Sequence, residues 1–278
     1  MHFETLKDKC EYFRSVTDYH LVPNSYAIVM LDGKNFSRLV KNKYELPFDK
    51  KFMRIMDETA KYLVKNIQGA KLAYTQSDEI SILITDFDTP ETDAPFGYRL
   101  CKMQSVYAAM AAGKFNQLAL LNEIKGRAYD YCLFDSEDTI YRIPDVVELI
   151  ENEKLAEFDC KAWSVPDYNT AFCHFLWRQN DCVRNSKQQA AQTYLPYKEL
   201  LKLTTDEQVA KLLETKDIDW NNYTDGEKYG RLIYKEEKLL NGVINGEERE
   251  YMRNVWESHP ASPFGEEDNI IKKLIPQR

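Results

Sequence analysis

Apolar and polar residues follow one another along the chain in patterns that predict short strands and amphipathic helices. Residues 25–31 form a β-prone run that ends abruptly at Asp32-Gly33, which predicts a buried strand. Residues 71–75 and 79–85 are two further β-prone runs around a short polar turn, the pattern of a hairpin. Residues 158–165 predict another strand. Apolar spacing and composition predict helices over 4–17, 48–68, 98–121, 168–194 and 204–214.

The end of the chain carries weaker signals. Residues 230–235 and 250–255 predict a late hairpin across Gly242 and Gly246. From Ser258 onward the sequence is rich in proline and charge, which predicts a loosely ordered tail.

The order of these elements predicts the fold class. Strand, helix, hairpin, helix and strand up to residue 165 indicate an α+β fold, in which helices back an antiparallel sheet. No internal repeat interrupts this order, and 278 residues suit one large domain or a domain with an appendage.

Composition and charge narrow the class of protein. Apolar residues make up 44% and aromatic residues 13% of the chain, which favours a globular protein over a disordered one. No apolar run approaches the roughly 20 residues of a membrane span, and the first residues show no signal-peptide pattern. We therefore expect a cytoplasmic protein without membrane contact. The net charge of −8 is a poor match for a protein that coats nucleic acid, although it allows a local basic groove.

The cysteines and histidines do not indicate a zinc site. None of the six cysteines forms a C-x-x-C pair, and the four histidines lack metal-ligand spacing. Free thiols in a reducing compartment are the expected state.

Two acidic segments stand at the ends of β-prone runs, Asp32-Gly33 and Ser77-Asp78-Glu79. A strand that stops at Asp-Gly presents its carboxylate at the sheet edge, and the glycine lets a ligand approach the backbone. A hairpin tip presents Asp78 in the same way, so the two carboxylates converge if these elements are neighbours. Two such carboxylates repel each other unless a cation lies between them, and oxygen ligands with phosphate are what Mg²⁺ prefers.

These residues predict a site for phosphoryl transfer with two Mg²⁺ ions. Ions about 3.5–4 Å apart would stabilise the attacking and leaving oxygens of an in-line displacement. Asp32 and Asp78 would bridge the ions, the Gly33 carbonyl would add a ligand, and Lys34 would neutralise a triphosphate. From spacing alone, an Asp-Gly turn and a polar hairpin tip are the commoner explanation. Glu79 by itself is more typical of a solvated or ion-paired residue than of a ligand.

Three motifs, in order, resemble those of the tRNA-His guanylyltransferase family. Residues 31–36, Leu-Asp-Gly-Lys-Asn-Phe, resemble its Leu-Asp-Gly-Arg-x-Phe motif. Residues 74–81, Tyr-Thr-Gln-Ser-Asp-Glu-Ile-Ser, resemble Tyr-Gly-Gln-Ser-Asp-Glu-Tyr-Ser. Residues 177–182, Trp-Arg-Gln-Asn-Asp-Cys, are similar to Trp-Arg-Gln-x-Asp-Cys. The resemblance covers about residues 5–235.

The resemblance implies an enzyme with a ferredoxin-like palm, as in polymerases, that extends the 5′ end of tRNA in the 3′–5′ direction. It implies Asp32, the Gly33 carbonyl and Asp78 as ligands of two Mg²⁺ ions, with Asp32, Asp78 and Glu79 as catalytic residues. A nucleoside triphosphate, ATP or GTP, would activate a 5′-monophosphate, and the 3′-hydroxyl of the incoming nucleotide would then attack that end. A homotetramer is the implied assembly. The implied nucleotide-binding residues are Asp32, Gly33, Lys34, Asn35, Phe36, Ser37, Asp49, Ser77, Asp78, Arg178 and Asn185.

The resemblance also suggests a division of the chain. We expect a palm-like catalytic domain at residues 1–165 and a helical part at 166–240 that packs on it and binds nucleotide or tRNA. Residues 241–278 form a C-terminal extension without an assigned role.

The predicted helix at 168–194 places four residues on one face, namely Arg178, Asp181, Cys182 and Asn185. Such a face suits a triphosphate or a tRNA backbone. A solvated face with an internal Arg178–Asp181 pair is the alternative. The aromatic residues of this helix, Phe172, Phe175 and Trp177, favour a place in the core over a base-stacking role.

This sequence departs from the family pattern in three places, the first of them a motif of the eukaryotic members. Those continue His-Ile-Asn-Asn after the third motif, whereas residues 183–186 here are Val-Arg-Asn-Ser. Met30 and Leu46 stand where the family often has Arg and Lys. The pattern resembles the bacterial and archaeal guanylyltransferase-like proteins that repair 5′-truncated tRNA by template-directed addition.

Four functions therefore compete. Repair of truncated tRNA is favoured, and addition of a single G at position −1 of tRNA-His is the alternative within the family. A nucleotide cyclase-like palm enzyme or a non-catalytic RNA-binding protein are alternatives from other classes. The two carboxylates argue against simple RNA binding, because binding a polyanion gains nothing from them.

Overall fold

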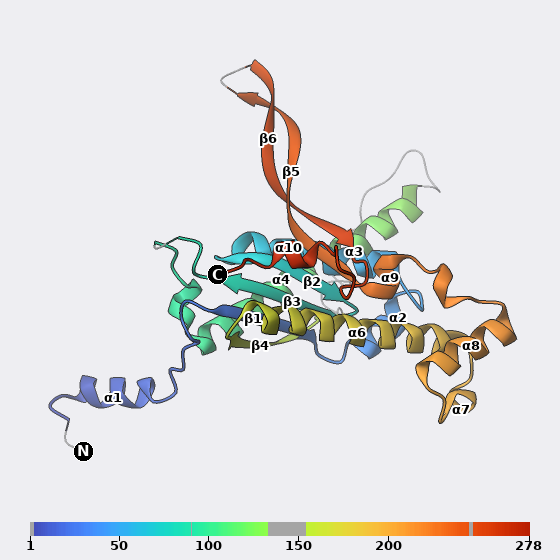
Figure 1. Ribbon diagram of the computed structural model, residues 1–278, viewed down its shortest axis with the longest axis horizontal. Coiled ribbons are helices and arrows are strands. Elements are labelled where there is room, and N and C mark those ends of the chain that lie inside the picture. Colours follow the sequence, from blue (N-terminus) through green and yellow to red (C-terminus); the bar gives the residue numbers. More distant parts are fainter. Residues whose placement is uncertain (1–2, 90, 133–153, 245–246) are drawn as a thin grey trace.

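A computed structural model describes residues 3–89, 91–132, 154–244 and 247–278 (Figure 1). Within these residues the chain forms an antiparallel sheet of six strands in the order β4-β1-β3-β2-β5-β6. The predicted α+β class, with an antiparallel sheet backed by helices, is confirmed. The strands are β1 (Tyr26–Gly33), β2 (Ala70–Gln76), β3 (Glu79–Thr85), β4 (Phe158–Val165), β5 (Arg231–Ile244) and β6 (Glu247–Pro260).

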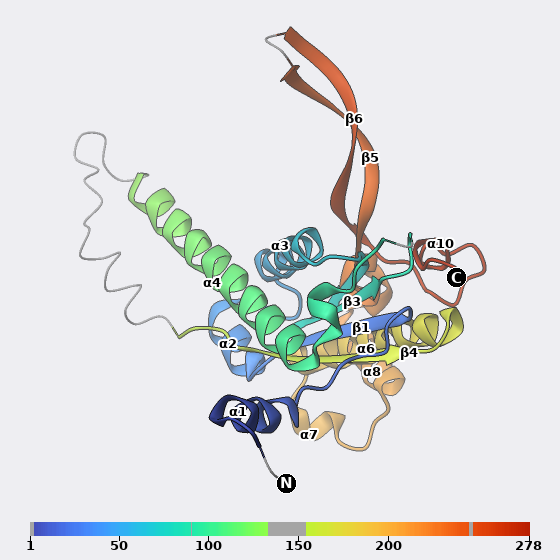
Figure 2. The same ribbon diagram turned by 90° about the vertical axis from the view of Figure 1, so that its left-hand side faces the viewer.

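Helices cover both faces of this sheet (Figure 2). The helices α3 (Lys50–Asn66) and α4 (Leu100–Cys132) pack on one face, and α6 (Tyr168–Tyr194) lies along the other. Side chains of a strand alternate between the two faces. Val29 of β1 therefore joins the core under α3 and α4, whereas Ile28 joins the core under α6. Each such fully buried aliphatic side chain stabilises the fold by about 1.5–3 kcal/mol.

Local sequence signals fix the ends of the long helices. The Asp49 carboxylate accepts the Phe52 N–H at 2.8 Å and begins α3, and Asp167 caps α6 in the same way at 2.7 Å from the Thr170 N–H. No helix in the described part of the chain is long and apolar enough to cross a bilayer. The shorter helices are α1 (Leu6–Ser15), α2 (Phe36–Lys43), α7 (Tyr197–Leu200), α8 (Thr205–Lys216), α9 (Asp225–Tyr229) and α10 (Ile271–Leu274).

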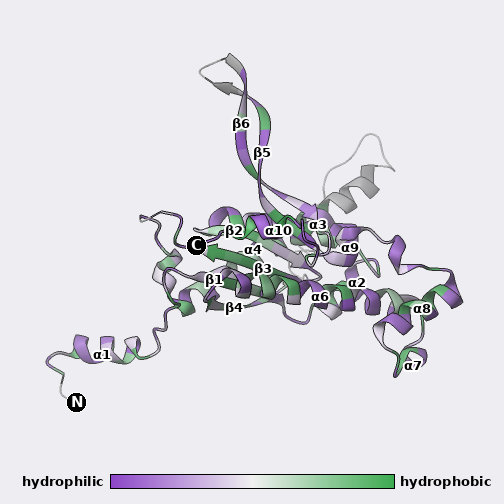
Figure 3. Ribbon diagram, viewed as in Figure 1, coloured by the Kyte–Doolittle hydropathy of each residue, from purple (hydrophilic) through white to green (hydrophobic). Residues whose placement is uncertain are grey.

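The predicted late hairpin exists but is much longer than expected. The chain returns to the sheet after α9, where β5 pairs with β2. Strands β5 and β6 then pair with each other along their whole length, from Arg231 opposite Pro260 to Ile244 opposite Glu247. Beyond the sheet they form a two-stranded arm whose residues are mostly hydrophilic, with a hydrophobic stretch on β5 (Figure 3). Because neither face of the arm is buried, it lacks the apolar alternation that reveals a strand. The turn expected at Gly246 lies outside the described residues.

The expectation of a loosely ordered tail after Ser258 is wrong. Ala261, Phe264, Ile271 and Ile275 are all buried in the core between the sheet and α6. The Tyr26 hydroxyl donates a hydrogen bond to the Pro276 carbonyl at 2.8 Å. These apolar residues are widely spaced among charges and prolines, so no local periodicity reveals the face that they bury.

Candidate active site

Asp32 and Asp78 lie at the same end of the sheet. The antiparallel register of β1 and β3 pairs Asp32 with Glu79, the neighbour of Asp78. The Gly33 N–H donates to the Asp78 carbonyl at 3.2 Å, which joins the end of β1 to the hairpin tip. Ser77 turns the hairpin with a positive φ of 48°. Two acidic segments far apart in sequence are thus held side by side by strand pairing.

The electrostatics of this end favour a bound cation. Burial, together with the negative charge of Asp32, raises the pKa of Asp78 to about 6. The pKa of Asp32 is raised by burial and by the negative charge of Asp159, the residue of β4 that is paired with Asp32 in the sheet. The carboxylates are therefore partly desolvated and repel one another, and a divalent cation would relieve both costs.

The available ligands suit a Mg²⁺ ion that also binds substrate phosphates and water, and they do not form a metal site made of protein ligands alone. Among the described residues, no group of three or more His, Cys, Asp or Glu side chains is arranged as a metal site. Magnesium in phosphoryl-transfer enzymes is commonly held by one or two carboxylates together with substrate phosphates and water. Asp32 and Asp78 would supply the carboxylates. Position 33 has to be a glycine, because a Cβ there would lie 2.4 Å from the Phe36 ring.

Glu79 is held in a buried ion pair with Arg178 of α6. The Arg178 Nε donates to Glu79 at 2.7 Å, and its Nη2 contacts the second carboxylate oxygen. The two residues are 8% and 5% exposed. Gln76 and Ser81 also donate to Glu79, at 3.2 and 3.3 Å. Burial raises the pKa of Glu79 and the Arg178 charge opposes this shift. The pair ties the hairpin tip to α6 and so positions Asp78.

The Arg178 guanidinium also donates to the Asp181 carboxylate at 2.9 Å. The Arg178–Asp181 pair expected within the helix is therefore present, but Arg178 is buried and not on a solvated face. Trp177, expected in the core, is 56% exposed and its ring lies 4.4 Å from the Arg178 guanidinium carbon. The core prediction is wrong for Trp177, because it lies two residues from the buried Phe175 and so on a different helix face.

His174 completes the polar network under α6. Its Nε2 lies 3.1 Å from the Ser81 hydroxyl, and its ring packs against Trp163 and Phe175. Burial, with a smaller contribution from the Arg178 charge, lowers the pKa of His174 to about 4. The imidazole is therefore neutral at physiological pH.

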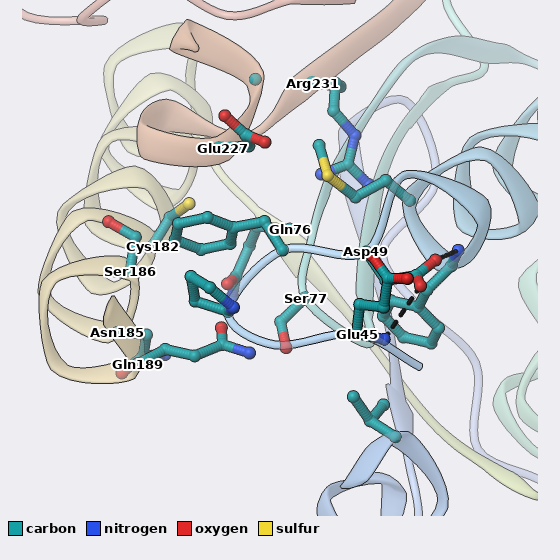
Figure 4. A pocket seen from close by; sticks show the side chains of 16 residues that line it. Glu45, Asp49, Gln76, Ser77, Cys182, Asn185, Ser186, Gln189, Glu227 and Arg231 are labelled. Carbon is teal, nitrogen blue, oxygen red and sulfur yellow. Dashed lines mark hydrogen bonds between the residues drawn. The ribbon is translucent and has the colours of Figure 1, made fainter. Parts of the chain in front are cut away.

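A pocket opens between the hairpin tip, α6 and the start of α3 (Figure 4). Asn185 comes from α6, Ser77 from the tip, and Asp49 from the opposite wall. Asp49 is engaged as the cap of α3 and also accepts the Glu45 N–H at 2.9 Å. Three of the predicted nucleotide-binding residues therefore line one pocket.

The other predicted nucleotide-binding residues, those at 32–37 together with Asp78 and Arg178, lie outside the lining of this pocket. Lys34 is exposed and forms an ion pair with Glu157 at 2.7 Å. Phe36 is buried among Phe52, Phe115 and Phe158. Its side chain is a core residue, whereas the neighbouring Asn35 and Ser37 are exposed at the start of α2.

Sequence reasoning missed Arg231, the first residue of β5. Its side chain is 6% exposed and its Nε donates to Asp57 at 2.7 Å. Its Nη2 has no hydrogen-bond partner among the described residues, and Arg231 lines the pocket. A buried donor without a partner suits an anionic ligand. No local motif marks this arginine, which reaches the site only because β5 pairs with β2.

An antiparallel sheet with two carboxylates at one end, backed by two helices, is the palm arrangement of enzymes that transfer nucleotidyl groups. A sequence model described as tRNAHis guanylyltransferase matches residues 7–166. The chain belongs to this family of nucleotidyltransferases, whose members are tRNA guanylyltransferases and 3′–5′ polymerases.

Individual relatives match most of the chain. A protein of Acanthamoeba polyphaga mimivirus is 27% identical over 87% of this chain and 82% of its own length. The tRNA(His) guanylyltransferase of Debaryomyces hansenii is 24% identical over 83% of this chain and 81% of its own. Among solved structures, a bacterial tRNA(His) guanylyltransferase-like protein in complex with ATP superposes with a TM-score of 0.78. It is 29% identical, and the match covers 99% of this chain and 100% of that protein. A complex of such a bacterial protein with GTP gives a TM-score of 0.70 at 28% identity, covering 97% of this chain and 98% of that protein.

Proposed function

We propose that this enzyme adds nucleotides in the 3′–5′ direction to the 5′ end of truncated tRNA, by template-directed repair with two Mg²⁺ ions. The observation that carries the proposal is the coupling of Asp32 and Asp78 at one end of the palm-like sheet, with the raised pKa of Asp78 that results. A partly buried carboxylate beside a second, exposed one is costly unless the two bind a cation, and this is an arrangement that metal-assisted phosphoryl transfer uses.

The pocket residues supply the roles that nucleotide binding needs. The free Nη2 of Arg231 would donate to a phosphate oxygen, while the Ser77 hydroxyl and the Asn185 amide offer neutral hydrogen bonds. ATP and GTP are the expected ligands, since the bacterial relatives were solved with them. The Glu79–Arg178 pair would keep the hairpin tip rigid during the reaction.

Asp32, Asp78 and the Gly33 carbonyl would hold Mg²⁺, which when bound would stabilise charge on the attacking and leaving oxygens. In the proposed transfer, the 3′-hydroxyl oxygen of the incoming nucleotide forms a bond to the α-phosphorus, the one attached to the 5′-oxygen of the RNA. The bond from that phosphorus to pyrophosphate, or to AMP on an adenylylated end, breaks. The hydroxyl proton passes to solvent. The protein's part is to hold the two reacting ends in line.

Repair is favoured over single-G addition by residues 183–186, Val-Arg-Asn-Ser, which lack the histidine of the eukaryotic motif. The similarity to the bacterial guanylyltransferase-like protein over the full length of both chains points the same way. Addition of one G to tRNA-His remains the second candidate, supported by the Debaryomyces relative of that name.

Assembly and location are part of the proposal. The α1 helix exposes Leu6 and Phe13, and its C-cap exposes Val16; these residues are 79%, 61% and 55% accessible in the single chain. Such an apolar face supports a homo-oligomer, for which we expect a tetramer. The five cysteines whose side chains the structure describes are free thiols, which supports a reducing, cytoplasmic compartment.

The test is a 5′-extension assay with Mg²⁺ and each nucleotide supplied separately. A 5′-triphosphorylated tRNA lacking its first nucleotides should be extended with the nucleotide that pairs with the opposing base. Full-length tRNA-His, supplied with GTP, is the matched control. Preference for the control tRNA, independent of its opposing base, would replace repair by single-G addition. A cyclic nucleotide formed without RNA would show a cyclase instead.

A further inference from the structure

A groove runs along α3 from the pocket beside the hairpin tip. That pocket shares Met53 and Glu227 with a neighbouring hollow of about 230 Å³. That hollow shares Glu58 and Lys61 with a larger one of about 580 Å³, which lies between α3, α4 and the base of the arm. Figure 2 shows α3 between α4 and the β5–β6 arm. We call these two hollows together the α3 groove.

Four cations of α3 line this groove, and in its smaller hollow three of them face as many acids, Asp57, Glu58 and Glu227. Lys50, Arg54, Lys61 and Lys65 all line it and are spaced by four, seven and four residues, which places them on one helical face. At about 1.5 Å per residue they extend over roughly 22 Å of helix. This length exceeds what one nucleoside triphosphate covers, so a longer polyanion is needed to contact them all.

The larger hollow is strongly basic although the chain carries a net charge of −8. Its lining contains the acid Glu58, which bonds Lys61 at 3.0 Å. Four further cations line it, and none makes an ion pair with a residue in the described part of the chain. They are Lys65, Lys114, Lys235 and Arg253. In an acidic protein, unmatched cations gathered in one hollow repel each other and focus a positive potential there.

Aromatic side chains hold some of these cations in place. The Lys114 ammonium lies 5.6 Å from the Tyr62 ring centre, and the Lys235 ammonium lies 5.1 Å from that of Trp256. Tyr62 is 38% exposed, so its ring also offers a surface for a sugar or base. Cations interleaved with aromatic rings are typical of RNA-binding surfaces.

We propose that the α3 groove binds the phosphate backbone of the RNA whose 5′ end enters the active site. The inference rests on the proposed function, because it takes RNA as the substrate. It assigns the groove as a second anchor, remote from the reacting atoms, that holds the body of the RNA through charge and reads no sequence. Because the groove would not distinguish RNA sequences, the enzyme could bind different tRNAs there, and the added nucleotide would be selected only at the active site.

The test compares two triple variants with the wild-type chain. Lys65→Ala/Lys235→Ala/Arg253→Ala removes three exposed cations of the groove. The control, Lys9→Ala/Lys216→Ala/Lys273→Ala, removes three exposed lysines on α1, α8 and α10 that make no ion pair within the described residues. Binding of fluorescent full-length tRNA is measured by anisotropy from 50 to 300 mM salt, and 5′ extension is measured in parallel.

Each phosphate contact contributes about 0.7–0.9 to the slope of log Kd against log salt. The groove variant should therefore lose about two units of slope and bind tRNA at least about tenfold more weakly than the control. Its kcat and its KM for nucleotide should match those of the control, with the loss confined to the KM for tRNA. Equal Kd and equal slope in the two variants would overturn the proposal. Failure of the proposed function is a separate result, namely no 5′ extension by the wild-type enzyme.

Discussion

Charged side chains are buried and paired at the active-site end of the sheet, whereas in the α3 groove several are exposed and unpaired. At the sheet end, the Glu79–Arg178 pair is buried and matched, and both of its residues are below one-tenth exposed. In the groove, cations such as Lys65 and Lys235 are exposed and have no acidic partner among the described residues. The pair joins the hairpin tip to α6, whereas the groove lies along α3 on the other face of the sheet.

The difference indicates two roles for charge: the buried pair positions a catalytic residue, and the exposed cluster attracts the polyanionic substrate. A buried matched pair is rigid and short-ranged, which suits a group that must hold Asp78 in place. An exposed unmatched cluster acts over a Debye length of about 8–10 Å and can adapt to a mobile polyanion. The carboxylates of Asp32 and Asp78 are intermediate between these cases, because Asp32 is exposed, Asp78 is partly buried, and their charges are balanced only when a cation binds.

The largest expected effect is loss of catalysis on removing one carboxylate. Asp78→Asn keeps the shape of the side chain and removes its charge, so 5′ extension should slow by about a thousandfold or more, equivalent to about 4 kcal/mol in the barrier. The melting temperature should stay level or rise, because a desolvated, repelled charge has been removed. Single-turnover extension and thermal unfolding measure the two quantities. Near-normal rates would contradict the metal assignment.

Breaking the buried pair should cost stability instead. Arg178→Met leaves Glu79 charged, buried and unpaired, and the free energy of unfolding should fall by about 3–5 kcal/mol. The double variant Arg178→Met/Glu79→Gln should regain much of this loss, because no lone charge remains. Urea denaturation of both variants checks the prediction. A single variant as stable as the wild type would show that the pair is not desolvated as the geometry indicates.

The buried His174 should make stability depend on pH. In the unfolded chain its pKa is about 6.5, whereas in the folded chain it is about 4. Stability is therefore full above pH 6.5 and is lost as pH falls toward 4, by up to about 3 kcal/mol. His174→Gln should reduce the slope of the unfolding free energy against pH between pH 4 and 6.5 by the equivalent of about one bound proton. An unchanged slope in the variant would mean that His174 accepts its proton as readily in the folded chain.

The smallest expected effect concerns one groove cation. Lys65→Glu should raise the KM for tRNA by about tenfold and leave kcat unchanged, because Lys65 affects how tRNA associates with the enzyme and stays bound, and not the chemical step. The exposed Lys216 of α8 gives the matched control, Lys216→Glu. If both charge reversals raised KM equally, the effect would reflect net charge and not the groove.

How much the sequence predicts depends on how local the signal is. The strand before Asp32-Gly33 and the hairpin around Ser77-Asp78 were predictable because alternation and turn residues mark them directly. The meeting of Asp32 and Asp78 was also predictable, once the two elements were taken as neighbours. The motifs that these two segments carry are contiguous in sequence, and for that reason they also make the family recognisable.

Features built from distant segments were not predictable. Arg231 reaches the pocket through pairing of β5 with β2, and no pattern near it signals that contact. The groove joins Lys65, Lys114 and Arg253 from three elements, which only the fold brings together. Phe264 and Ile275 of the C-terminal segment pack into the core without local periodicity. In each case the decisive information is tertiary.

The central claim, that Asp32 and Asp78 share divalent cations required for 5′ extension, is tested most directly by a Mg²⁺ titration. Single-turnover extension of a 5′-triphosphorylated, truncated tRNA would be followed from chelated to millimolar Mg²⁺. The account predicts no extension without the ion, and addition of the nucleotide that pairs with the opposing base as Mg²⁺ rises. Extension that persists under chelation, or no extension of any tRNA at any Mg²⁺ concentration, would contradict it.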